Sequence, residues 1–311
     1  MRLFYNLTGH SHMIILDCET YANYFLVSML DTTTNKTIDF ELYDNHPIDS
    51  KKLAAILRQH TTIGFNSSNY DLPVIVAALR GDNNAQIKQL SDDIINAPKL
   101  WPVLKKHKIN IPASFDHIDI MPIPIGQASL KIYGGRLHAP KLQDLPIEPN
   151  AIITPEQRAI LRLYCHNDLQ VTAILYEELK PQIALREQMS KQYGIDLRSN
   201  SDAQIAENVI KHELEAKNID CTRPTVKIGT KYKYTTPKHI TFKNPLFNDL
   251  VAMIERTDFV VNDNGQVALP DELLTKISFD GAEYQLGIGG IHSCESSQAV
   301  IAQDDECLFD I

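Results

Sequence analysis

The sequence predicts an α/β protein in which a mixed central sheet is flanked by helices. Three apolar stretches of strand length come first, and helical and strand-like patterns then alternate along the chain. The 311 residues are enough for two or three domains. We expect a leader or tail at residues 1–12, a first domain at 13–180, and a smaller α+β region at 181–311.

The first strand is expected from Ile14 to Thr20, because three apolar residues lead into it. Alternate residues of a strand share a face, so Asp17 and Glu19 point the same way, about 7 Å apart. Two like charges on one face of a core strand are costly unless a cation lies between them. The sequence therefore indicates either a divalent metal site or an edge strand with two solvated acids.

The next elements follow from alternating patterns and turn residues. A hairpin meander is predicted from strands at 24–30 and 37–42, and an amphipathic helix at 48–59 precedes a short strand at 61–65. Asp71 then stands at the entrance of a helix that runs to about Arg80. Taken alone, Asp71 is most simply a helix cap or a first-turn acid.

The middle of the chain is less regular. We expect a helix at 87–95 and an extended segment at 115–121. Residues 126–149 are rich in Gly and Pro, with Lys131, Arg136 and Lys141 among them, and are interpreted as a helix and loop over a cleft.

A long helix is predicted to begin after Thr154, since Pro155 follows this cap residue and Gln157 completes a capping box. We expect it to end at about Leu179, before Pro181. Its apolar stripe passes through Leu161, Cys165, Asp168, Thr172, Leu175 and Leu179.

Asp168 breaks the apolar pattern of that stripe, which is typical of a functional site. Tyr164 lies one turn earlier, at the spacing that lets both side chains meet one target. We therefore interpret Asp168 as a functional residue.

Three of these segments together resemble the proofreading 3′–5′ exonucleases of the DEDD superfamily. Asp17-Cys18-Glu19 matches the first motif of that superfamily, Asn66 with Tyr70-Asp71 the second, and Tyr164 with Asp168 the third. The histidine branch would need His where this chain has Leu163, so the chain resembles the tyrosine branch.

The surrounding residues are similar to those of phage-type family B DNA polymerases. Tyr193 to Gln204 and Gly287 to Ser293 look like phage replicative enzymes. In those proteins this region leads into the palm, whose first catalytic Asp would here be Asp310. We expect the amino-terminal part of a polymerase that ends before the palm and has no polymerase activity of its own.

The resemblance implies a ribonuclease-H-like exonuclease fold and two Mg²⁺ or Mn²⁺ ions. Asp17 would bridge both ions, Glu19 and Asp168 would complete the site that activates water, and Asp71 would hold the second ion. Tyr164 would orient the attacking water. The alternative is a catalytically silent exonuclease-fold module that binds DNA or serves as a scaffold of a polymerase.

The implied partners are the 3′ end of single-stranded DNA or a primer–template, and the remainder of the polymerase. Asn66 is the candidate for contacting the terminal nucleotide. Phe65, Tyr70 and Tyr133 are candidate stacking platforms, and each is alternatively a core or surface aromatic.

Residues 222–245 hold six basic residues and no acid, and Lys231 and Lys233 alternate there with tyrosines. This pattern indicates either a strand along DNA phosphates or a solvated hairpin. We also predict a helix at 246–256 and a tight backbone conformation at 280–292, where glycines are frequent.

Apolar content, cysteine spacing and net charge limit the cellular location and the partners of this protein. No apolar run approaches the length of a membrane span, and scattered cysteines without a CxxC pair predict a reduced, intracellular protein. The resemblance to phage polymerases implies that this location is the cytoplasm of the host. The net charge of −9 argues against a protein that coats DNA. It is compatible with an enzyme that holds metal ions with acids.

Overall fold

The computed structural model describes residues 13–126, 128–222 and 226–294. The chain falls into two compact units that divide after Asp220. The predicted boundary at 180 lies inside a long helix, so the division comes later than expected. The predicted tail at 1–12 and Asp310 lie outside the described residues.

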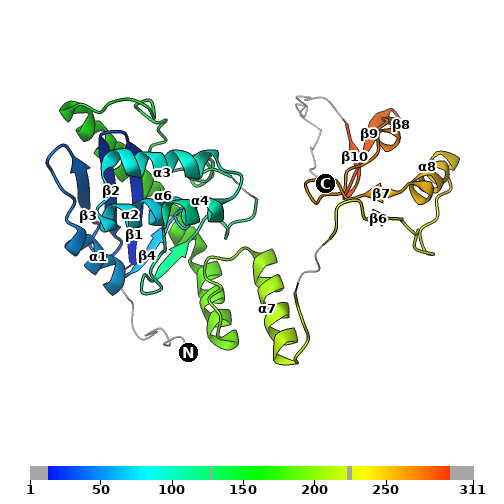
Figure 1. Ribbon diagram of the computed structural model, residues 1–311, viewed down its shortest axis with the longest axis horizontal. Helices are drawn as coiled ribbons and strands as arrows, with labels where there is room; N and C mark the ends of the chain where they lie inside the picture. The colour runs from blue at the N-terminus through cyan, green and yellow to red at the C-terminus, as the bar shows by residue number, and fades with distance from the viewer. Residues whose placement is uncertain (1–12, 127, 223–225, 295–311) are drawn as a thin grey trace, which may run out of the picture. The chain divides into compact units, whose positions relative to one another are not determined.

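A five-stranded mixed sheet forms the centre of the first unit (Figure 1). Its order is β3-β2-β1-β4-β5; β1, β2 and β3 form an antiparallel meander, and β4 and β5 run parallel to β1. The strands are β1 (Met13–Tyr21), β2 (Tyr24–Asp31), β3 (Lys36–Tyr43), β4 (Thr61–Gly64) and β5 (His117–Asp119). The predicted α/β class and hairpin meander are confirmed.

Helices cover both faces of this sheet (Figure 1). They are α1 (Ser50–Gln59), α2 (Asp71–Arg80), α3 (Asn84–Asn96), α4 (Leu100–His107), α5 (Leu130–Arg136) and α6 (Pro155–Tyr193). Helix α7 (Asp202–Ala216) follows α6 in the chain and does not belong to the cores on these two faces. Leu16 on β1 shares a core with residues of α2, α3 and α4, whereas Ile15 shares another with residues of α5 and α6. Neighbouring residues of a strand point to opposite faces, so α2 and α6 lie on opposite sides of β1.

Most helices begin within a few residues of their predicted starts, but α4 was not predicted. It has eight residues, and its Pro102 reads as a helix breaker. Proline is tolerated in the first turn, where its missing N–H has no intrahelical partner in any case. Val103 then packs into the core beneath α3.

The predicted start of α6 is confirmed, because Thr154 and Gln157 form a capping box. Its predicted end before Pro181 was wrong, since the helix continues to Tyr193 and ends at Gly194 in the left-handed conformation. An interior proline costs about 3 kcal/mol. Burial of Ile183 just beyond it contributes about 1.5–3 kcal/mol, which offsets much of this cost.

The buried side chain of Arg186 ties α6 to the start of α7. Its Nε donates to the carbonyl of Asn200 at 2.9 Å, and its Nη2 binds the carboxylate of Asp202 at 2.6 Å. Helices α6 and α7 are separate, and Gly194 ends the first of them. In the described parts of the chain, none of the helices is both long enough and apolar enough to cross a bilayer.

The second unit is built from short strands around one helix. It contains β6 (Lys231–Tyr232), α8 (Pro245–Arg256), β7 (Phe259–Val260), the 3₁₀ helix η1 (Asp271–Leu273), β8 (Ile277–Phe279), β9 (Ala282–Gly287) and β10 (Gly290–Ser293). The predicted helix at 246–256 is confirmed as α8. The predicted glycine feature is the hairpin in which Gly287 of β9 pairs with Gly290 of β10.

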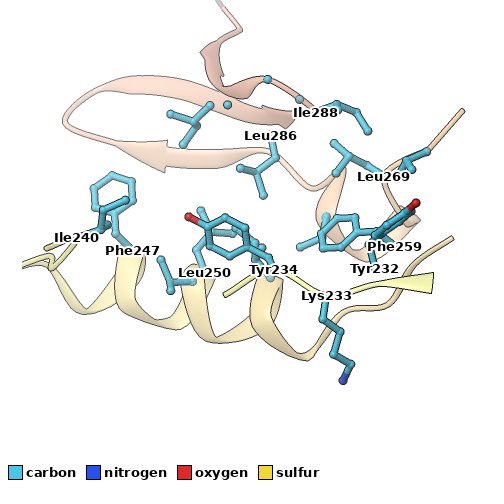
Figure 2. A pocket seen from close by; sticks show the side chains of 18 of the residues that line it. Tyr232, Lys233, Tyr234, Ile240, Phe247, Leu250, Phe259, Leu269, Leu286 and Ile288 are labelled. Atoms are coloured by element: carbon cyan, nitrogen blue, oxygen red, sulfur yellow. The ribbon is translucent and has the colours of Figure 1, made fainter. Parts of the chain in front are cut away.

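An apolar pocket of about 790 Å³ lies within this second unit. Tyr234 and Phe247 line one side of it, and Leu286 and Ile288 line another (Figure 2). The tyrosines of the basic stretch thus contribute to the packing of this unit.

Candidate metal centre

Strand β1 and helix α6 bring the first site residues together. Asp17 and Glu19 lie on the same face of β1, which is confirmed by their closeness to one residue of α6, Cys165. One carboxylate oxygen of each acid and the Cys165 Sγ lie within 4.8 Å of one another. The thiol of Cys165 donates to Oδ2 of Asp17 across 3.4 Å.

The two remaining acids lie within electrostatic range of this pair. Burial, and then the charge of Asp168, raise the pKa of Asp17 to about 7. Burial raises the pKa of Glu19 well above its usual value, with further contributions from Asp17, Asp168 and Asp71. Asp17, Asp71 and Asp168, which span 151 positions of the sequence, thus all lie close enough to Glu19 to raise its pKa.

Asp71 is the first residue of α2 and is 3% exposed. Tyr70 is the cap of that helix, so Asp71 is a first-turn acid and not the cap. Its Oδ1 has no hydrogen-bond partner, and burial followed by the charge of Asp17 raises its pKa. A buried acceptor left unsatisfied costs about 1–3 kcal/mol. A hard cation would satisfy this oxygen, so the carboxylate donors fit Mg²⁺ or Mn²⁺.

Tyr164 and Asp168 interact as their spacing on α6 predicts. Burial raises the pKa of Tyr164 above its ordinary value, and the neighbouring Asp168 raises it further. Burial also raises the pKa of Asp168, although the Tyr164 hydroxyl and the charge of Lys131 act in the opposite direction. Tyr164 consequently keeps its proton at neutral pH and can donate a hydrogen bond.

Sequence reasoning missed two residues of this site. Cys165 was interpreted as part of the apolar stripe, and its contact with Asp17 depends on how α6 crosses β1. Lys131 of α5 was noted as one of several dispersed basic residues. It is close enough to Asp168 to lower its pKa, and its amine also binds Asp144 at 2.9 Å.

A pocket of about 410 Å³ lies beside Tyr164. Lys141, Gln143 and Asp144 line one wall, and Ile160 and Leu163 of α6 line the other. The segment at 126–149 contains the helix α5 and borders this pocket, as its interpretation as a helix and loop over a cleft predicts.

The residues proposed to contact DNA have mixed environments. Asn66 has φ of 59°, and its side chain accepts a hydrogen bond from Asn69. The hydroxyl of Tyr70 hydrogen-bonds with Ser91 of α3 at 2.8 Å. The half-buried ring of Phe65 meets Tyr133 edge-on, and Tyr133 is 5% exposed. Tyr133 is therefore a core aromatic, the alternative that the sequence left open.

Lys231 and Lys233 belong to the second unit. Both amines lie near the carboxylate of Asp258, at 3.1 and 3.7 Å. The Lys233 side chain extends away from the apolar pocket (Figure 2). Part of the positive charge of this stretch is thus balanced by an acid that follows it in the sequence. A role of these lysines in binding DNA stays a prediction.

No family model matches this chain, and no curated protein matches it.

Proposed function

We propose that the first unit is a metal-dependent 3′–5′ exonuclease with a ribonuclease-H-like fold, acting on single-stranded or frayed DNA. It would be the proofreading part of a phage-type family B DNA polymerase in the host cytoplasm. The observation that carries this proposal is the convergence of four acids, from β1, α2 and α6, beside one tyrosine. The mixed sheet with helices on both faces is compatible with the proposed fold.

Asp17, Glu19, Asp71 and Asp168 would hold two Mg²⁺ or Mn²⁺ ions. When bound, such ions supply Lewis-acid chemistry and neutralise charge on a scissile phosphate. The protein contributes a buried cluster of oxygen ligands, which is costly to keep charged without a cation. A bound cation would remove this cost, so the cluster should favour cation binding.

The other side chains would position the reactants. Tyr164 keeps its proton, so its role is to orient the attacking water by hydrogen bonding, and not to act as a base. The pocket beside Tyr164 offers a place for the terminal nucleotide, and Asn66 would contact that nucleotide. A frayed or mismatched end would be preferred, because unpairing it costs less.

The test is degradation of single-stranded DNA labelled at its 5′ end, with Mg²⁺ or Mn²⁺ and with a chelator. We expect progressive shortening from the 3′ end that the chelator abolishes, and no nucleotide incorporation. DNA binding without chelator-sensitive shortening would favour the silent module. Release of label as short 5′ fragments would contradict the proposed polarity.

Replacing Tyr164 by phenylalanine is expected to slow this degradation by about 10–100-fold, because the water loses its orienting hydroxyl. The Mn²⁺ concentration for half-maximal activity should stay within about twofold, since no proposed ligand changes. Rates measured across a Mn²⁺ titration test this. Tyr176→Phe is the matched control on the same helix and should behave as wild type; a large change in Mn²⁺ requirement for Tyr164→Phe would contradict the assigned role.

A further inference from the structure

We propose that Asp119 is a positioning residue that holds Asn66 and Asp71 in place. The reaction part of this inference rests on the proposed exonuclease function. Asp119 is the last residue of β5, and it is 2% exposed. It was not among the predicted site residues, because it belongs to an extended segment with no recognisable motif.

The carboxylate of Asp119 accepts three backbone hydrogen bonds. Oδ1 accepts from the N–H of Asn66 at 2.9 Å and from that of Met121 at 3.1 Å. Oδ2 accepts from the N–H of Ser68 at 3.0 Å. Hydrogen bonds to a charged carboxylate are stronger than those between neutral groups, so this side chain binds the loop after β4 firmly.

This loop carries one site residue and leads into another. Asn66 adopts a left-handed conformation, which is unfavourable for most residues other than glycine and is tolerated by asparagine. The carbonyl of Asn66 accepts from Tyr70, and that of Ser67 accepts from Leu72 in the first turn of α2. Asp71 stands between these two donors. A displacement of the loop would therefore move both Asn66 and Asp71.

Ser67 makes two further contacts between this loop and the sheet. The Ser67 hydroxyl is hydrogen-bonded to Nε2 of His117, also on β5, at 2.7 Å. A Cβ atom added to Gly64 would lie 2.4 Å from the Ser67 side chain, so the glycine permits this close approach. Ser67 of the loop therefore packs against Gly64 of β4 and is hydrogen-bonded to His117 of β5.

The segment after α6 braces β5 in turn. The N–H of Asp119 donates to the Ser199 hydroxyl at 2.9 Å. Arg198 forms ion pairs with Asp116 at 2.7 Å and with Asp196 at 2.8 Å. Residues 196–199 lie within the stretch from Tyr193 to Gln204, which resembles phage replicative polymerases. Ser199 of this stretch supports Asp119 directly, whereas Arg198 stabilises the chain just before β5 through Asp116.

The test compares Asp119→Asn with Asp116→Asn in the full chain, with Mn²⁺ binding followed by electron paramagnetic resonance. Asparagine preserves size but points an amide N–H₂ at one of the backbone donors. We expect Asp119→Asn to weaken Mn²⁺ binding by about tenfold and to lower kcat for DNA degradation at least tenfold. Asp116→Asn, one residue before the same strand, weakens the ion pair with Arg198. It should lower the thermal midpoint while Mn²⁺ binding stays within about twofold of wild type.

Wild-type Mn²⁺ affinity in Asp119→Asn would overturn the proposal, and so would an equal loss in both variants, which would indicate a general effect of destabilising β5. If Asp119→Asn does not fold, Ser199→Ala removes one brace of Asp119 and should weaken Mn²⁺ binding by about twofold to fivefold; an unchanged affinity would then overturn it. A wild type that binds Mn²⁺ and degrades no DNA would refute the exonuclease alone. A wild type that binds no Mn²⁺ would refute both.

Discussion

Replacing Asp168 by alanine is expected to lower the rate of 3′ degradation by about a thousandfold or more. Asp168 is a proposed ligand, and it is also the neighbour that positions Tyr164, so its loss removes two contributions at once. Asp17→Ala should have an effect of the same size, because Asp17 raises the pKa of both Glu19 and Asp71 and so lies close to each.

The same substitutions should leave the chain folded. Two unit charges about 4 Å apart repel by about 4 kcal/mol at an effective dielectric constant of 20, so removing one acid relieves repulsion in the metal-free cluster. Rates and thermal midpoints, measured on the same preparations at pH 8 with a chelator in the melting buffer, test both parts. Glu178→Ala, on an exposed position of α6, is the control and should change neither quantity. Undiminished degradation by Asp168→Ala or Asp17→Ala would refute the site.

Divalent cations are expected to raise the thermal midpoint of the first unit strongly at pH 8 and little at pH 5. Burial and Asp168 raise the pKa of Asp17 from 3.8 to about 7 in the folded chain. The folded state therefore binds more protons than the unfolded state between these values. This stabilisation is complete below about pH 4 and is lost as pH rises through about 7, so the chelated protein should be less stable at pH 8 than at pH 5.

Cations replace the lost protons at pH 8. At a concentration one hundred times Kd, a ligand specific for the folded state adds about 2.7 kcal/mol, or about 5–10 °C for a unit of this size. Melting curves with EDTA or Mn²⁺ at pH 5, 6, 7 and 8 measure this. Asp17→Asn should flatten the pH dependence and abolish most of the shift. An equal Mn²⁺ shift at pH 5 and pH 8, or one that survives in Asp17→Asn, would contradict the assignment.

Local patterns in the sequence predicted much of the first unit. The period of two in a strand places Asp17 and Glu19 on one face, and the 3.6-residue period of a helix places Asp168 in the stripe that packs on the sheet. Capping residues indicate where α6 begins, because Thr154 satisfies donors within one turn of itself. These are short-range properties, so the order of residues is enough to predict them.

Other features depend on contacts that local patterns do not contain. The end of α6 was predicted from Pro181, and burial of Ile183 against distant residues decides otherwise. Lys231 and Lys233 were interpreted as part of a strand along DNA phosphates or of a solvated hairpin, and neither interpretation contained their pairing with Asp258, more than 20 residues later. The second unit was the least predictable, since its strands are two to six residues long.

Local sequence patterns were enough to assign Asp17, Glu19 and Asp168 to their strand and helix, because helix and strand periodicity follow from neighbouring residues. Long-range contacts were needed to place Asp71 near the acids of β1, with one carboxylate oxygen unpartnered. They were also needed to bring Asp119 to the loop after β4. Both depend on the pairing of β4 between β1 and β5, which brings together segments about 50 residues apart through burial of their shared core.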